Sequence, residues 1–149
     1  MSNPTFHGYA YTDGDIALIL QGCRQEILTI ATNRPNTIES GHIYVSRTSD
    51  IKRWADGLKW TCTRRNGDIT VYKQLDPTSN TEVTLIRTIR NVVFDRCRYR
   101  FWSYYSDDEV KLLRTLLSPS QHDGLKNLVP DDDLLDFLQV YPGVCVEAD

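Results

Sequence analysis

The sequence predicts an α+β fold: a single globular domain with a mainly antiparallel sheet and a few flanking helices. Three observations predict it. A helical apolar pattern opens the chain, short β-rich segments fill its middle, and capping signals mark two more helices near its end. The 149 residues suit one domain, and 40% hydrophobic and 25% charged residues are typical of globular proteins.

The N-terminal element is a helix, predicted over residues 13–28. Thr12 stands at its N-cap, and Asp15 completes a capping box near the positive end of the helix. Apolar residues recur on one face at steps of four and three, at Ile16, Leu20, Cys23, Ile27 and Ile30. Residues 33–40 are polar and include a proline, so we expect a loop there.

β-branched and aromatic residues predict the strands in the middle of the chain. Short strands are expected at residues 42–46 and 69–73, and a meander at residues 81–88, 91–94 and 98–105. Residues 47–67 show no clear period. A loop of this length in a compact domain is usually functional or wrongly assigned.

Two helices are predicted near the end of the chain. Ser106 and Glu109 form a capping box for the first, and Pro119 ends it. Its apolar face consists of Val110, Leu113 and Leu117. Pro130 and Asp131 begin a short third helix, which contains Leu134, Leu135 and Leu138.

No enzyme, cofactor or metal signature is present in the sequence. Walker A, GxGxxG, HExxH and GxSxG patterns are missing, so we expect a protein that is not an enzyme and takes no cofactor. A Cys–His pair that meets only in the fold stays open as an alternative. The cysteines and histidines lack zinc-ligand spacing, which predicts no metal site. No long apolar stretch or signal peptide is recognisable, so no membrane partner is expected.

Charge is unevenly distributed along the chain. The net charge is −3, yet residues 34–100 carry 13 basic against 7 acidic groups and residues 101–149 carry 3 against 10. The basic middle favours a polyanionic partner.

Cations and tryptophans interleave within residues 47–67. The cations are Arg47, Lys52, Arg53, Lys59, Arg64 and Arg65. Such cations neutralise phosphates, and an arginine can enter a narrow A/T-rich minor groove. Trp54 and Trp60 can anchor this loop or stack on bases. The alternative is a solvated loop with two core tryptophans. A second basic set is more simply explained as surface charge and consists of Arg87, Arg90, Arg96, Arg98 and Arg100.

Several segments resemble the WOPR family of fungal transcription regulators. They are residues 5–9 (TFHGY), 23–24, 40–45 and above all 51–60 (IKRWADGLKW), followed by a second block with LIRT at 85–88, FWSYYS at 101–106 and LSPS at 117–120. The resemblance runs from about residue 5 to residue 120. It implies one α+β DNA-binding domain over residues 1–125, built from blocks of about 5–75 and 81–120. An acidic segment with a short helix follows at residues 126–149.

The resemblance implies a sequence-specific, nuclear DNA-binding regulator that prefers A/T-rich double-stranded DNA and controls morphological or developmental switching. Lys52 and Arg53 match the DNA-contact motif, with Arg53 as the minor-groove candidate. Further phosphate or base-edge contacts are expected at Lys59, Arg64 and Arg65, with Arg47 in the same basic cluster. Trp54 and Trp60 become loop anchors.

This sequence departs from the family pattern at two places in that motif. Ala55 replaces a threonine that would be a kinase site, and residues 61–63 (TCT) replace Ser-Pro-Ser. The second change and the overall acidity favour an alternative: a divergent WOPR-like protein-interaction module that does not bind DNA.

The acidic end has a composition similar to acidic activation segments, in which charge keeps apolar groups available to a coregulator. Its apolar residues are Leu134, Leu135, Phe137 and Leu138. Two alternatives stay open. The helix can pack on the sheet through its leucines, or the acidic end can fold over the basic loop.

Overall fold

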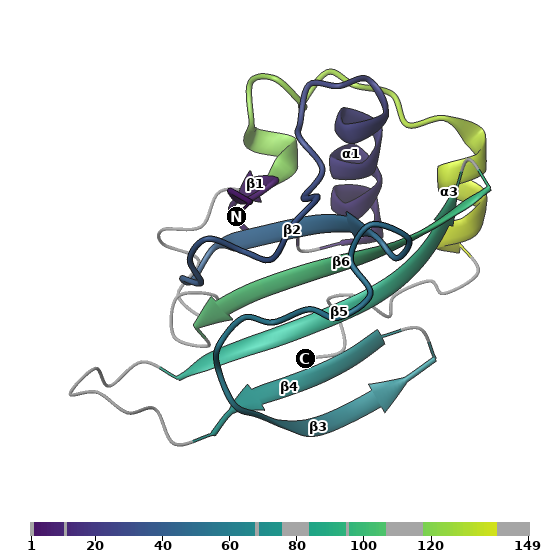
Figure 1. Cartoon of the computed structure of the whole chain (residues 1–149). Helices are drawn as coiled ribbons and strands as arrows, with labels where there is room; N and C mark the ends of the chain where they lie inside the picture. Colours follow the sequence, from purple (N-terminus) through teal and green to yellow (C-terminus); the bar gives the residue numbers. More distant parts are fainter. Residues whose placement is uncertain are drawn as a thin grey trace.

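The computed structural model describes residues 2–10, 12–67, 69–75, 84–94, 96–106 and 118–139, and shows a sheet with helices packed on one side (Figure 1). Within these residues the sheet is antiparallel and has six strands, in the order β1 (Phe6–His7), β2 (His42–Arg47), β6 (Cys97–Ser106), β5 (Leu85–Phe94), β4 (Ile69–Gln74) and β3 (Trp60–Asn66). The predicted α+β fold is therefore confirmed.

Strands β5 and β6 form a long hairpin at the centre of the sheet. Their register runs without a break from the Leu85–Ser106 pair to the Phe94–Cys97 pair. The interruption expected between residues 88 and 91 is therefore wrong, because Ile89 and Val92 continue the strand on its two faces. The earlier part of that predicted strand, residues 81–83, lies outside the described residues.

Helix α1 (Asp13–Arg24) begins at the predicted capping box. Asp15 N donates to Thr12 Oγ1 over 3.1 Å, and Thr12 N donates to Asp15 Oδ2 over 3.2 Å. The helix ends four residues earlier than predicted, because Glu26 adopts a left-handed φ of 61° and the next two N–H groups donate to Gly22 O. Ile27 is consequently 47% exposed and does not join the apolar face.

Gly22 is required where the chain folds back over the end of α1. A Cβ atom at this position would lie 2.8 Å from Leu125 Cδ2 and 3.1 Å from Leu28 Cδ1. Both contacts are with side chains that pack into the core, so they leave little room for a substituent.

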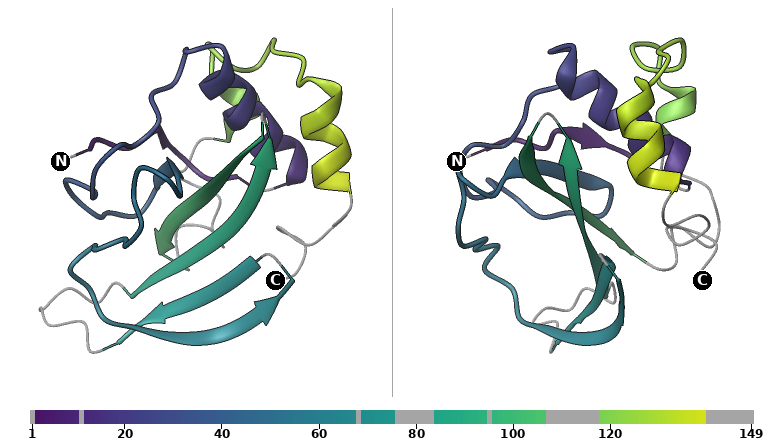
Figure 2. Two further views of the ribbon diagram at one scale, coloured as in Figure 1. Left: turned by 45° about the vertical axis from the view of Figure 1, so that its right-hand side comes forward. Right: turned by 90° about the vertical axis from the view of Figure 1, so that its right-hand side faces the viewer.

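The two sides of the sheet are covered by different parts of the chain (Figure 2). On the helix side, α1 and α3 (Asp132–Gln139) pack against Ile43, Val45, Val92 and Phe101. On the loop side, the segment of residues 48–59 packs through Ile51 and Trp54 against Tyr44, Trp102 and Tyr104.

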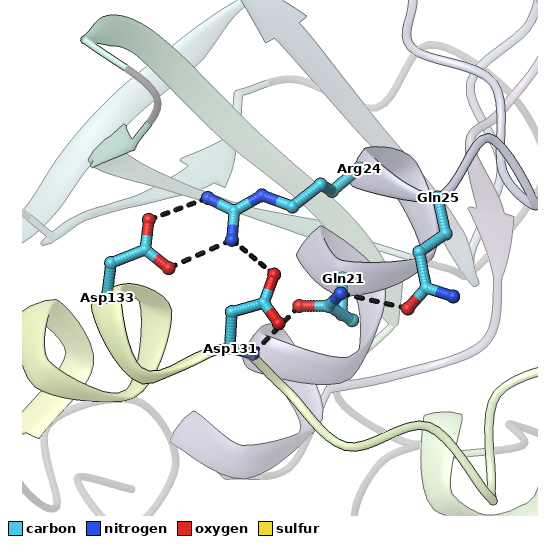
Figure 3. Close-up of polar contacts among 5 residues, drawn as sticks. All are labelled: Gln21, Arg24, Gln25, Asp131 and Asp133. Carbon is cyan, nitrogen blue, oxygen red and sulfur yellow. Dashed lines mark hydrogen bonds and ion pairs between the residues drawn. The ribbon is translucent and has the colours of Figure 1, made fainter.

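A polar clamp joins α3 to α1 (Figure 3). Arg24 donates to Asp131 over 2.7 Å and to both carboxylate oxygens of Asp133 over 2.7 and 2.9 Å. The Asp131 N–H donates to Gln21 Oε1 over 2.9 Å, and Gln21 Nε2 donates to Gln25 Oε1. The clamp therefore connects the start of the acidic helix to the last turn of α1.

Helix α3 confirms the third predicted helix. Leu134 is fully buried in the same core as Leu125, and Leu135 is half-buried against that core. This burial supports the packing alternative for the acidic end. The side chains of Phe137 and Leu138 lie outside the described residues.

The described chain contains one further helical turn, η1 (Pro119–Gln121). Ser106, expected to cap a helix, is the last residue of β6, and residues 107–117, over which that helix is predicted, lie outside the described residues. None of the described helices is long and apolar enough to cross a membrane. Three thiols, those of Cys23, Cys62 and Cys97, are free.

Candidate nucleic-acid interface

Trp54 fixes the loop segment to the sheet. Its indole lies parallel to that of Trp102, with ring centroids 4.6 Å apart and an interplanar angle of 14°. Its edge meets Tyr44 at a centroid distance of 5.4 Å, and its Nε1 donates to Tyr104 Oη over 2.6 Å. Stacking and a partly buried hydrogen bond together give the segment a defined position.

Asp56 forms the second attachment of the segment. Its carboxylate is 4% exposed and accepts hydrogen bonds from Arg87 Nη1 over 2.9 Å and from Tyr104 Oη over 2.8 Å. It also accepts from Trp60 Nε1 and from the Leu58 N–H, each over 3.1 Å. A buried carboxylate with this many donors is fully satisfied.

Two residues beside Asp56, Gly57 and Tyr104, have distinctive properties. Gly57 has a φ of 79°, the left-handed region that favours glycine. Burial, reinforced by the Asp56 charge, raises the pKa of Tyr104 far above its ordinary value. Tyr104 therefore stays protonated and relays a hydrogen bond from Trp54 to Asp56.

The buried arginines of the second basic set are structural. The Arg87 guanidinium lies over the rings of Tyr72 and Trp60, at 4.3 and 4.7 Å from their centroids, besides its ion pair with Asp56. Arg90 is 3% exposed, and its Nη1 lies 2.7 Å from Asp13 Oδ1. For these two residues the expectation of ordinary surface charge is wrong.

Lys52 and Arg53 form an exposed bend in the segment that covers the loop side. Ile51 before them is buried, and Trp54 after them is stacked, whereas both basic side chains are exposed. Among the described residues, neither has a carboxylate partner. Two exposed cations, unpaired within the described part of the chain, thus lie between two fixed residues. We call residues 51–54 the basic bend.

A β-bulge at Thr63 in β3 sets which sides of the sheet Arg64 and Arg65 face. Thr63 is an extra residue between the pairs that Cys62 and Arg64 make with β4, so the alternation of side chains shifts by one residue. The β4 partners of Arg65 and Trp60 lie an even number of residues apart, which places both side chains on the loop side. Arg64 faces the opposite side.

The remaining two predicted cations lie at different ends of the segment. Lys59 is exposed directly before β3, where its carbonyl accepts from the Leu75 N–H over 2.8 Å. Arg47 pairs in register with Tyr99 and donates from Nε to its hydroxyl over 3.3 Å. Tyr99 belongs to the helix-side core, so Arg47 does not lie on the same side as the basic bend.

The loop side therefore carries exposed cations on a rigid aromatic base, an arrangement suited to binding phosphates and base edges. Within the described part of the chain, no three histidine, cysteine, aspartate or glutamate side chains are grouped to hold a metal ion.

Comparison with known proteins identifies the family. Residues 5–93, more than half of the chain, match the family model described as "Gti1/Pac2 family". The chain belongs to the Gti1/Pac2 family. The matched segment contains the whole basic bend, Asp56 and Arg87.

Relatives of this Gti1/Pac2 chain are fungal transcription regulators. It is 41% identical over 81 residues to the transcriptional regulator MIT1 of Saccharomyces cerevisiae, a match that covers 49% of this chain and 12% of that protein. Over 81 residues it is 31% identical to the white-opaque regulator 1 of Candida albicans, covering 49% of this chain and 10% of that protein. The chain spans between a tenth and a quarter of the length of the first curated relatives it matches.

A solved structure has the same fold. It is the complex of the WOPR domain of Wor1 in Candida albicans with a 13-bp double-stranded DNA, at a TM-score of 0.76 and 25% sequence identity. The superposition covers 93% of this chain and 98% of that one. The resemblance to the WOPR family is thereby confirmed.

Sequence reasoning missed the residues that hold the Gti1/Pac2 loop in place. Asp56 has no role of its own in the sequence analysis, and Arg87 is assigned there to surface charge. Both stand inside the segments that carry the resemblance, and this was the available signal. Strand β3 was also missed, because Trp60–Asn66 was assigned to the long loop.

Proposed function

We propose that this chain is a DNA-binding domain of a fungal transcription regulator and that the basic bend reads A/T-rich double-stranded DNA. The observation that carries the proposal is the contrast within one motif. Trp54 and Asp56 are fixed to the sheet, whereas Lys52 and Arg53 are exposed and have no carboxylate partner among the described residues. Pre-positioned cations of this kind suit a polyanion.

Each cation has a distinct part in this proposal. Arg53 enters the minor groove, where a narrow A/T-rich tract concentrates negative potential. Lys52, Lys59 and Arg65 neutralise phosphates and set the register on the duplex. Trp54 and Trp60 anchor the loop, and their stacking and hydrogen bonds inside the protein support this role over intercalation between bases.

We further propose that the protein acts in the nucleus, in regulation of the morphological or developmental type. The names of its relatives as transcription regulators support this place of action. Residues 1–125 form the DNA-binding unit in this proposal. Helix α3 of the acidic segment completes its core through Leu134.

Fluorescence anisotropy tests the function. The chain is titrated against an A/T-rich and a G/C-rich duplex across a salt series, together with Arg53→Ala and Lys126→Ala. We expect A/T preference, a steep salt dependence and a loss of about 1–3 kcal/mol for Arg53→Ala at the A/T-rich site. Lys126, paired with Asp123 three residues before it, is the matched control and should bind as the wild type does.

One outcome would overturn the proposal in favour of a protein-interaction module. A chain that melts cooperatively but binds neither duplex at low salt keeps the fold without the DNA role.

A further inference from the structure

The loop side of the sheet carries a second pair of cations that the basic bend does not include. Trp102 and Tyr104 of β6 lie on the loop side, and Arg98 and Arg100 continue the same row at steps of two residues. Tyr99, between them, is buried in the helix-side core, as the alternation requires. Arg100 therefore lies next to Trp102 on the loop side, and Trp102 is the residue that stacks on Trp54.

Within the described residues, these two arginines differ from Arg24, Arg87 and Arg90 in having no ion pair. Arg24, Arg87 and Arg90 each lie within 2.9 Å of a carboxylate oxygen. For Arg98, which is exposed, and Arg100, which is half-buried, the described residues supply no carboxylate partner. Arg24, Arg87 and Arg90 thus stabilise the fold through their ion pairs. The charges of Arg98 and Arg100 are available to a ligand.

A surface hollow of about 490 Å³ is lined by Arg98 and Arg100 together with Thr48, Asn91, Val92, Val93 and Tyr99. Thr48 contributes to its lining, and this residue is attached to β6 by a hydrogen bond of 3.0 Å from its N–H to Arg98 O. Asn91 lies opposite Arg100 in the ladder and adds an amide group to the lining. Arginine, threonine and asparagine side chains are among those that contact phosphate and sugar in protein–DNA complexes.

We propose that Arg98 and Arg100, with Asn91 and Thr48, form a second phosphate-binding site that contacts the duplex backbone beyond the basic bend. This inference rests on the proposed DNA-binding function and deepens it. Two residues on one face of a strand are about 6.8 Å apart, so the two guanidinium groups can meet different phosphates. Contacts of this type add affinity and fix register, and they carry no direct base readout.

The test uses Arg98→Gln, Arg100→Gln and the double variant, measured by anisotropy on the same A/T-rich and G/C-rich duplexes across salt. Each single variant should reduce the slope of log K against log salt by about 0.9, and the double variant by about 1.8. Because the lost contacts go to phosphates, the ratio of A/T to G/C affinity should stay as in the wild type. Lys73→Gln removes an exposed strand cation from the opposite side and should leave the slope unchanged.

A footprint gives a second readout. Hydroxyl-radical cleavage of the duplex should show protection at one flank of the site with the wild-type chain and loss of that protection with the double variant. Melting temperatures of the variants check that the fold is kept.

Failure of this inference differs from failure of the proposed function. If wild type binds in an Arg53-dependent manner while the double variant keeps its slope and footprint, the second site is refuted and the DNA role stands. A lower A/T to G/C ratio in the double variant would also refute a site limited to phosphates. If the wild-type chain binds neither duplex, both the proposed function and this inference are refuted.

Discussion

The Nη1 atom of Arg87 lies 2.9 Å from Oδ2 of Asp56, and the two side chains are 12% and 4% exposed. This ion pair links β5 at the centre of the sheet to the segment that carries the basic bend. Charges buried this deeply are stable only as a hydrogen-bonded pair. The position of the exposed cations thus depends on a buried pair that does not itself reach the surface.

Asp56→Ala should lower the free energy of unfolding by about 3–5 kcal/mol, because it leaves the Arg87 charge buried without its partner. Urea denaturation followed by tryptophan fluorescence measures this. Asp50→Ala removes an exposed carboxylate from the same loop and should change stability by no more than about 0.5 kcal/mol. Equal small effects for both variants would contradict a structural role of the pair.

Arg65→Gln and Arg64→Gln should have unequal effects on DNA binding, since strand alternation places the two side chains on opposite sides of the sheet and the bulge at Thr63 puts Arg65 on the loop side. Arg65→Gln should weaken binding to all duplexes similarly and reduce the salt slope by about one unit. Arg64→Gln should bind nearly as the wild type does. Anisotropy across salt compares them, and the reverse order would show that the opposite side meets the DNA.

Leu134→Ala should destabilise the domain by about 2–5 kcal/mol, because the side chain is fully buried in the core. Val129→Ala is the control, since Val129 is 80% exposed nearby in the sequence. Thermal and chemical denaturation give the difference. A Leu134→Ala chain as stable as the wild type would instead favour a helix whose leucines are available to a coregulator.

His42 should make stability depend on pH. Burial lowers its pKa below the ordinary value of 6.5, although the Thr37 carbonyl and the Glu39 charge act in the opposite direction. His7, whose ring centroid lies 5.5 Å away, reinforces the lowering. The unfolded chain therefore takes up a proton at a higher pH than the folded chain does, and the free energy of unfolding falls as pH drops below 6.5.

Urea denaturation at several values between about pH 8 and pH 5 measures this dependence. His42→Gln should flatten the curve below pH 6.5. His122→Gln shows whether the loss of any histidine has the same effect. An unchanged slope in His42→Gln would exclude His42 as its source.

The sequence predicts those elements whose signals are local. Thr12 and Asp15 locate the start of α1, and the alternation around Tyr99 locates β6. The end of α1 was missed because the turn at Glu26 and the fold-back onto Gly22 depend on packing against Leu125. Propensity alone carries no such tertiary information.

Strand β3 was missed for a related reason. Its residues from Thr61 to Asn66 are all exposed, so no alternation of apolar and polar residues marks the strand. The bulge at Thr63 disturbs the period further. What keeps these residues in a strand is the ladder with β4, which a single sequence does not display.

The cations of the candidate site could be predicted from the sequence. The residues that hold these cations in position could not. Lys52 and Arg53 stand out by composition and by family resemblance. Arg87 is 31 residues from Asp56 in the sequence, and no local pattern connects two charges so far apart. Which arginines are paired, and which remain available, is decided only when the sheet forms.

Strand β3 is the last in the order of the described sheet, and no described strand pairs with its outer edge. An open edge offers backbone groups to the edge of a second molecule and is a common start of aggregation. Arg64 and Arg65 stand on this edge, where like charges repel an approaching copy. High salt screens that repulsion. Concentrated protein should therefore remain dispersed at low ionic strength and self-associate as salt is added.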